Sequence, residues 1–270
     1  MERVLLDGLG TATGLTYHQM LADNVPAIEL GDLHPSLGDT RPAEVIAPAP
    51  LQRLYVRHTV GLTDPLRVTD ITPDERLEDG LPQTLEEYVR HQGVAYFKIK
   101  VSGDRVSDMD RLHRITEVLE PGAGEYAVTL DGNEQYEDLG DFLVLLEAMA
   151  ADPHLSRLHD RILYIEQPLE RAAALDPAAA DLIRRASEHG PMLIDESDGE
   201  LTSFREAISL GYAGVSSKNC KGLTKALANQ ALARHLTTAG QGTYFLSGED
   251  LMNLPVVPLH QDLAHLACLG

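Results

Sequence analysis

The hydrophobic pattern of the chain alternates between two periods. Short runs rich in apolar and β-branched residues have the composition of buried strands, and between them apolar residues recur at the spacing of amphipathic helices. The pattern predicts seven strands, at residues 53–59, 96–101, 126–131, 162–166, 192–195, 213–218 and 243–248. It predicts helices at residues 108–119, 141–150, 178–190, 201–211 and 223–236.

This order of strands and helices predicts the α/β fold class with a parallel sheet. Seven successive βα units favour a closed, TIM-like (β/α)7-8 barrel over an open sheet. Residues 1–50 are less regular, and the run PAPLQ at 48–52 marks a boundary. We therefore predict an N-terminal arm over residues 1–50 and a barrel domain over residues 51–270.

Two lysines interrupt the strand-like run AYFKIKV at 95–101. Because side chains alternate along a strand, Lys98 and Lys100 are predicted on one face, opposite Phe97, Ile99 and Val101. A solvated edge strand is one interpretation. Chemistry is the other, because lysine can titrate whereas arginine keeps its charge. The chain has lysine only at positions 98, 100, 218, 221 and 225. Of these, Lys221 and Lys225 follow a strand end and are expected to be nearly silent when replaced by arginine.

Three successive predicted strands end in a carboxylate, at Asp131, Glu166 and Asp195. Each one alone could cap a helix or form a turn. In a parallel barrel, however, the carboxyl ends of the strands meet at one mouth, where three carboxylates repel unless a cation lies among them. A set of oxygen ligands without His or Cys favours Mg²⁺, with Mn²⁺ as the second choice.

A metal ion beside lysines suits the removal of a proton α to a carboxylate. That reaction produces a dianionic enolate, so the site must neutralise charge and also present a base. A divalent cation supplies the charge. A lysine supplies the base, because neighbouring cations lower the pKa of an ammonium group.

Composition excludes several classes of partner. The formal net charge of -20 argues against nucleic acid and anionic membranes, which require a basic patch. The longest apolar stretch, residues 142–151, is too short to span a membrane and contains Glu147, and the N-terminus lacks a basic segment followed by an apolar one. Cys220 and Cys268 lack metal-site spacing. We therefore expect a cytoplasmic protein.

Five motifs occur in order: KIK at 98–100, DGN at 131–133, IEQP at 165–168, DES at 195–197 and SSKNCKG at 216–222. They resemble the strand-end motifs of the enolase superfamily, in its muconate-lactonizing and mandelate-racemase-like branch. The resemblance implies that Asp131, Glu166 and Asp195 bind Mg²⁺. It implies that Lys100 and Lys218 are acid/base catalysts on opposite faces of the substrate, with Lys98 as an electrostatic helper. Further contacts to the ligands or the substrate are expected from Asn133, Glu196, Gln167, His58, Asn219 and Glu249.

The resemblance leaves the reaction open. Racemisation or epimerisation of a small carboxylic acid or amino-acid derivative is the leading expectation, because lysines flank the metal ligands along the chain. A cycloisomerase or an acid-sugar dehydratase could use the same residues. Two alternatives belong to other classes: a Schiff-base aldolase that uses Lys218 or Lys100, and a non-catalytic barrel that binds a metal.

Members of this superfamily carry an α+β capping domain ahead of the barrel, and here that domain is almost absent. The first 20 residues resemble only the last capping helix, and the chain ends before an eighth strand. We therefore expect a fragment or a trimmed protein with open sheet edges. Such edges lead us to expect a homo-oligomer with slow turnover of a small-molecule carboxylate.

Overall fold

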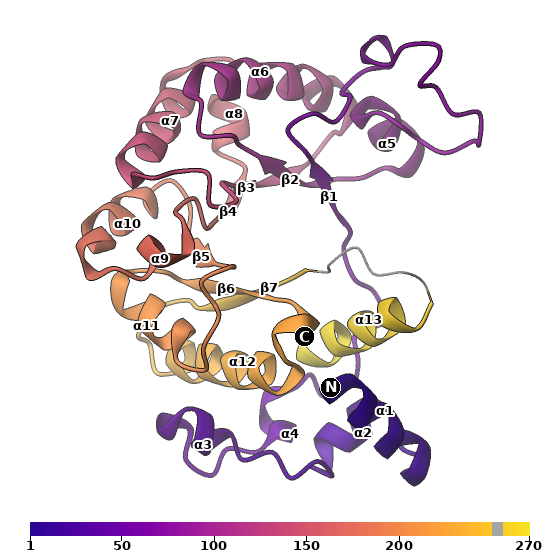
Figure 1. Cartoon of the computed structure of the whole chain (residues 1–270), viewed down its shortest axis with the longest axis vertical. Helices are drawn as coiled ribbons and strands as arrows, with labels where there is room; N and C mark the ends of the chain where they lie inside the picture. Colours follow the sequence, from indigo (N-terminus) through magenta and orange to yellow (C-terminus); the bar gives the residue numbers. More distant parts are fainter. Residues whose placement is uncertain (250–255) are drawn as a thin grey trace. The chain divides into compact units, whose positions relative to one another are not determined.

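Strands and helices alternate from residue 57 onward in the computed structural model, which describes residues 1–249 and 256–270 (Figure 1). The chain forms two units. The five-strand unit consists of residues 55–196 and 210–212. The two-strand unit consists of residues 1–54, 197–209 and 213–270.

The strands of the five-strand unit pair in chain order, and every pairing is parallel. They are β1 (Arg57–Val60), β2 (Tyr96–Lys100), β3 (Ala127–Asp131), β4 (Ile162–Glu166) and β5 (Met192–Ile194). The α-helices are α5 (Leu85–Gln92), α6 (Arg105–Gly122), α7 (Leu139–Ala151), α8 (Ser156–His159), α9 (Arg171–Ala174) and α10 (Ala180–Ala186). Two 3-10 helices, η2 (Val68–Asp70) and η3 (Pro177–Ala179), lie in the connections.

Polar side chains at the helix starts explain where these helices begin. The hydroxyl of Thr84 accepts a hydrogen bond from the Glu87 amide at 3.2 Å, at the start of α5. The carboxylate of Asp104 accepts one from the Ser107 amide at 2.8 Å, at the start of α6. Each bond satisfies an amide that has no partner within its helix. In Figure 1, α6 and α7 form one layer beside β2, β3 and β4.

The two-strand unit contains one parallel pair, β6 (Gly214–Ser217) with β7 (Phe245–Gly248). Its α-helices are α1 (Glu2–Thr13), α2 (Tyr17–Ala22), α3 (Leu30–Leu33), α4 (Pro42–Val45), α12 (Leu223–Thr238) and α13 (Val257–Leu269). Two 3-10 helices are η1 (Pro35–Leu37) and η4 (Asn219–Lys221), and α11 (Ser203–Leu210) begins in this unit.

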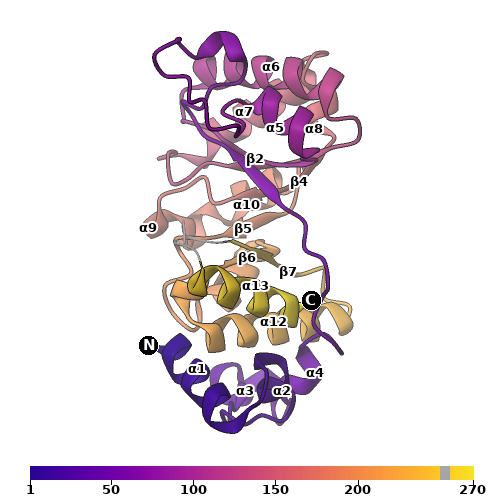
Figure 2. The same cartoon turned by 90° about the vertical axis from the view of Figure 1, so that its right-hand side faces the viewer.

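The core of the two-strand unit joins the first 50 residues to the last helices. Figure 2 shows α2, α3 and α4 beside α12 and α13. The buried residues at this junction are Leu21, Leu30, Leu37, Val45, Ile46, Ala226, Leu227, Ala228, Ala231, Cys268 and Leu269. The residues of the predicted arm thus pack against α12 and α13, and the proposed boundary near residue 50 stays a prediction.

The α/β class and the order of strands and helices are confirmed. All seven predicted strands are present, although β1 begins at Arg57 and not at residue 53. Tyr55 and Val56, which were assigned to that strand, are exposed. The five predicted helices correspond to α6, α7, α10, α11 and α12. Among the described residues, no helix combines the length and the apolar character needed to cross a membrane.

Candidate active site

Charged and polar side chains gather on one face of strands β2, β3 and β4. The register places Lys100 beside Asp131 and Asp131 beside Glu166. The opposite face of β2 carries Phe97 and Ile99, which are buried, so the predicted alternation is confirmed. We call the first face the carboxylate face and define it by Lys98, Lys100, Thr129, Asp131, Tyr164 and Glu166.

Two lysines and two carboxylates form a network on this face. The Nζ of Lys98 lies 2.9 Å from Oδ2 of Asp131 and 2.7 Å from Oε2 of Glu166. The Nζ of Lys100 lies 2.5 Å from the same Oδ2 of Asp131 and also donates to Oδ1 of Asn133. Burying a charge costs several kcal/mol unless an opposite charge compensates it. The lysines therefore make it possible to bury both carboxylates.

The DGN motif has a steric reason. A Cβ at Gly132 would lie 2.4 Å from Cα of Pro168, so a larger residue does not fit between the ends of β3 and β4. The next two residues, Asn133 and Glu134, have φ angles of 45° and 62°. The Asn133 amide donates to Oδ1 of Asp131 at 2.7 Å and so stabilises this turn. Residues other than glycine rarely adopt such positive φ angles. The few residues that do so concentrate at functional sites.

The residue that follows β4 contacts the backbone of the next predicted ligand, Asp195. The side chain of Gln167 is fully buried, and its Oε1 accepts a hydrogen bond from the Asp195 amide at 2.8 Å. A carboxylate oxygen of Asp195 lies within 4.8 Å of one from Glu166. The pKa of the Arg171 guanidinium is raised mainly by Glu134 and, to a smaller extent, by Glu196, the residue after Asp195.

These carboxylates have the chemistry of a magnesium site. Asp131, Glu166 and Asp195 are 3%, 1% and 2% exposed, and all three offer hard oxygen donors. Asp131 and Glu166 are the last residues of β3 and β4, and Asp195 directly follows β5. Glu166 and Asp195, whose carboxylate oxygens lie within 4.8 Å of each other, therefore fit a divalent cation of the Mg²⁺ type. The Oδ2 of Asp131 instead contacts Lys98 and Lys100.

His58 does not lie on the carboxylate face. Its ring centroid is 4.2 Å from that of Tyr88 on α5 and 6.5 Å from that of Phe97. The register pairs His58 with Phe97, so alternation turns its side chain toward α5. Burial lowers the pKa of His58. The structure therefore does not bring His58 to the predicted ligands, and a contact with them is not supported.

The neighbouring residue, Arg57, lies on the carboxylate face instead, and it was not predicted from the sequence. Its Nη1 donates to Oγ1 of Thr129 at 2.8 Å and lies 3.9 Å from Oε2 of Glu166. Its Cζ lies 5.2 Å from the ring centroid of Tyr164. The available signal was parity: Arg57 is two residues from Thr59, which pairs with Lys98.

The two-strand unit holds three of the predicted residues. The Nζ of Lys218, directly after β6, lies 3.3 Å from Oε2 of Glu249, directly after β7. The Nδ2 of Asn219 donates to Oδ1 of Asp262, which also pairs with Arg3 at 2.7 Å. Lys218 and Glu249 thus follow the carboxyl ends of two parallel strands, as the sequence predicts.

The remaining lysines differ from each other. Lys225 on α12 is buried, and its Nζ donates to the Asp198 carbonyl at 2.6 Å and lies 3.1 Å from Oδ2 of Asp198. Lys221 donates to the Ser216 carbonyl at 3.2 Å. The expectation that Lys225 could be replaced silently is therefore not supported, because its ammonium group is part of a buried ion pair.

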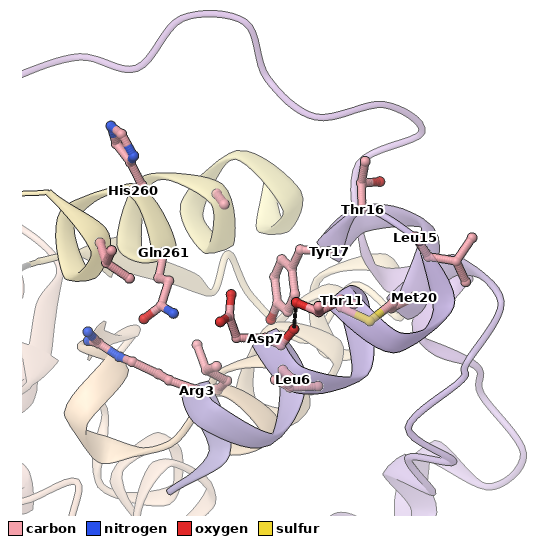
Figure 3. A pocket seen from close by; sticks show the side chains of 15 residues that line it. Arg3, Leu6, Asp7, Thr11, Leu15, Thr16, Tyr17, Met20, His260 and Gln261 are labelled. Atoms are coloured by element: carbon pink, nitrogen blue, oxygen red, sulfur yellow. Dashed lines mark hydrogen bonds between the residues drawn. The ribbon is translucent and has the colours of Figure 1, made fainter.

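A cavity of about 620 Å³ lies in the two-strand unit between α1, α2 and α13 (Figure 3). Its lining is mostly apolar and includes Leu6 and Met20, with polar groups from Arg3, Tyr17 and Gln261. Within the described part of the chain, none of the residues predicted as ligands or catalysts lines it. The cavity therefore shares no residue with the predicted metal and acid/base groups.

Residues 81–242 match the sequence model of the family described as enolase C-terminal domain-like. The structure is similar to a mandelate racemase/muconate lactonizing protein from Herpetosiphon aurantiacus, with a TM-score of 0.52 and 21% identity over 68% of this chain and 47% of that one. It is similar to an isomerase from Streptomyces coelicolor A3(2), with a TM-score of 0.57 and 17% identity over 97% of this chain and 57% of that one.

A third similar structure is a dipeptide epimerase from Methylococcus capsulatus, complexed with Mg and the dipeptide L-Arg-D-Lys. Its TM-score is 0.55, with 22% identity over 98% of this chain and 66% of that one. Comparison with curated proteins gives no match. The chain spans roughly half the length of the first of these solved structures, and at these identities the likeness shows the fold.

Proposed function

The chain belongs to the enolase C-terminal domain-like family, and from this we propose that it removes a proton α to the carboxylate of a small molecule. Asp131, Glu166 and Asp195 would hold Mg²⁺, or Mn²⁺ in its place. The bound cation would supply positive charge where the enolate oxygens become negative. Lys100 and Lys218 would exchange protons with the substrate carbon.

The observation that carries this proposal is the position of the two lysines among the buried carboxylates. The side chain of Lys98 is 8% exposed and contacts both Asp131 and Glu166. The side chain of Lys100, the last residue of β2, is 22% exposed. Lys100 is thus the lysine of β2 that a substrate at the strand ends can reach. This supports Lys100 as the base and Lys98 as the group that balances charge.

The subclass proposed is racemisation or epimerisation of a carboxylic acid or an amino-acid derivative. A dipeptide epimerase is among the structurally similar proteins, which makes dipeptides the first substrates to test. Cycloisomerisation and dehydration require the same proton abstraction and stay open. Asn133, Gln167, Glu196, Asn219 and Glu249 are proposed to support the ligands or the substrate. Self-association and a cytoplasmic location also stay predictions.

The test is exchange of the α-proton with solvent deuterium. A panel of dipeptides, acyl amino acids and small hydroxy acids is incubated in D₂O with Mg²⁺ or with EDTA, and exchange is followed by NMR. We expect exchange that requires Mg²⁺. Lys100→Arg should lower its rate about 10²- to 10⁴-fold, because arginine keeps the charge but does not accept the proton.

Two other outcomes would favour the other classes. Metal binding without exchange of any acid would indicate a non-catalytic metal-binding barrel. Turnover that persists in EDTA, together with borohydride trapping of a ketoacid on Lys100 or Lys218, would indicate a Schiff-base aldolase. Loss of exchange of one substrate enantiomer in Lys100→Arg and of the other in Lys218→Arg would support the assignment of the two lysines to opposite faces.

A further inference from the structure

Arg57 is the third cation on the carboxylate face. It is the first residue of β1, and its side chain is 16% exposed. The guanidinium reaches Thr129 at 2.8 Å and approaches Oε2 of Glu166 at 3.9 Å. Lys98 contacts the same Oε2 at 2.7 Å. Two protein cations therefore converge on one oxygen of a predicted metal ligand.

Lys98 alone does not balance the charge of Glu166. Its single ammonium group is divided between Asp131 and Glu166, which lie on neighbouring strands. Glu166 is 1% exposed, so water compensates little of its charge. A buried carboxylate needs opposite charge and hydrogen bonds to keep its ionised form. Arg57 provides a second positive charge next to Glu166.

Arg57 differs from the lysines in its partners, which include a hydroxyl group and an aromatic ring. Thr129 accepts its hydrogen bond, and the ring of Tyr164 faces its guanidinium at 5.2 Å. A guanidinium keeps its proton throughout the working pH range, whereas a lysine ammonium can release one and turns easily on its flexible stem. Arg57 therefore suits a permanent positive charge beside Glu166, whereas Lys100 suits proton transfer.

We propose that Arg57 is a positioning residue that holds the charge and orientation of Glu166 for a divalent cation, while Lys100 acts on the substrate. The inference rests on the proposed function and assigns to it a residue outside the five motifs. Some residues contact a metal ligand without touching the metal, and removing such a residue typically lowers metal affinity 10- to 100-fold.

The first test needs no metal. Arg57→Met, Glu166→Gln and the double variant are melted in EDTA. We expect Arg57→Met to lower Tm by about 4 °C or more when Glu166 is present, and by much less in the Glu166→Gln background. Additive effects of the two substitutions would overturn the proposal. Arg57→Lys, which keeps a charge but loses the planar group, should recover part of the loss.

The second test measures how tightly Mg²⁺ binds, from the rise of Tm during a titration with the metal alone. We expect Arg57→Met to raise the half-saturating Mg²⁺ concentration about 10-fold. Arg161→Met is the matched control: Arg161 is also 16% exposed and faces a tyrosine ring, that of Tyr126 at 4.4 Å, but it precedes β4 and does not contact a predicted ligand. It should lower Tm without changing Mg²⁺ binding.

Equal or tighter Mg²⁺ binding in Arg57→Met would overturn the proposal, because Arg57 would then be only a competing charge. An unaltered protein whose Tm does not respond to Mg²⁺ would instead contradict the proposed function. In that case the metal-free measurements still decide whether Arg57 positions Glu166, so the two failures are distinguishable.

Discussion

Two buried lysines, one in each unit, carry the same charge in different surroundings. Lys98 in the five-strand unit and Lys225 in the two-strand unit are both 7% exposed. Lys225 contacts the carbonyl and the carboxylate of one residue, Asp198. Lys98 is shared by Asp131 and Glu166, with a third buried carboxylate, Asp195, after the next strand. An ion pair in which the two charges compensate each other stabilises the fold. Several carboxylates close together at strand ends are instead suited to binding a cation.

The first prediction, with the largest expected effect, breaks the local pair. Lys225→Met keeps the length of the side chain but removes its charge beside the buried Asp198. We expect the free energy of unfolding to fall by about 3–5 kcal/mol, as when one partner of a buried ion pair is removed. Urea unfolding measures the loss, and Lys225→Met/Asp198→Asn should recover part of it. A loss below about 1 kcal/mol would mean that the pair is not a structural one.

The second prediction concerns the crowded carboxylates. Mg²⁺ should raise Tm, because occupancy relieves repulsion and ligand binding stabilises the folded state by about 2.7 kcal/mol at 100 times Kd. Glu166→Gln and Asp195→Asn should abolish this increment, whereas Lys225→Met should keep it. Thermal melts in EDTA and in millimolar Mg²⁺ provide the measurement. Identical melts of the unaltered protein in both would contradict a shared metal site.

The third prediction concerns the pH dependence of stability in the two-strand unit. Burial, with a smaller effect of Arg3, lowers the pKa of His265 on α13 to about 4. The unfolded chain therefore binds a proton near pH 6.5 that the folded chain does not bind, so stability falls as pH falls from about 6.5 toward 4. The loss from this group is about 2 kcal/mol at pH 5.

Hydrogen exchange at pH 7 and pH 5 checks the pH prediction, with His265→Gln as the comparison variant. We expect protection in α13 and in its partner α2 to decrease at pH 5 in the unaltered protein. The pH dependence should be weaker in His265→Gln, in which nothing titrates at that position. The Tyr17 hydroxyl on α2 lies 2.9 Å from Nδ1 of His265, so α2 and α13 belong to the same region. An equal pH dependence in both proteins would exclude His265 as its source.

The sequence predicted what depends on period and strand ends. Alternation placed Lys98 and Lys100 on one face, and the strand ends located Asp131, Glu166 and Asp195. Parity places Arg57 on the carboxylate face, but its contacts with β3 and β4 depend on a long side chain that reaches past β2, which no local pattern encodes. His58 was expected to contact the ligands or the substrate, although the parity of the strand turns it to the other face.

Lys225 was misjudged for a different physical reason. A helix that follows a strand usually has one polar face, so a lysine on it is expected in solvent. The helix α12 is instead buried on several sides, and its own buried residues include Leu223, Leu227 and Asn229. The packing of residues 1–50 against α12 covers surface that the local pattern leaves open. Such packing between segments distant in sequence is the part that the sequence alone did not reveal.

The smallest expected effect comes from Lys221, which sharpens the comparison because it is close to Lys225 in sequence. Lys221 donates to a main-chain carbonyl, that of Ser216, at 3.2 Å, and arginine can make the same kind of bond. We expect Lys221→Arg to change the free energy of unfolding by less than about 0.5 kcal/mol. Lys225→Arg, measured in parallel, should cost more, because a planar guanidinium does not fit the buried site of an ammonium group. Equal costs for the two variants would mean that burial of the lysine does not decide its role, and the contrast between local pairs and crowded carboxylates would lose its basis.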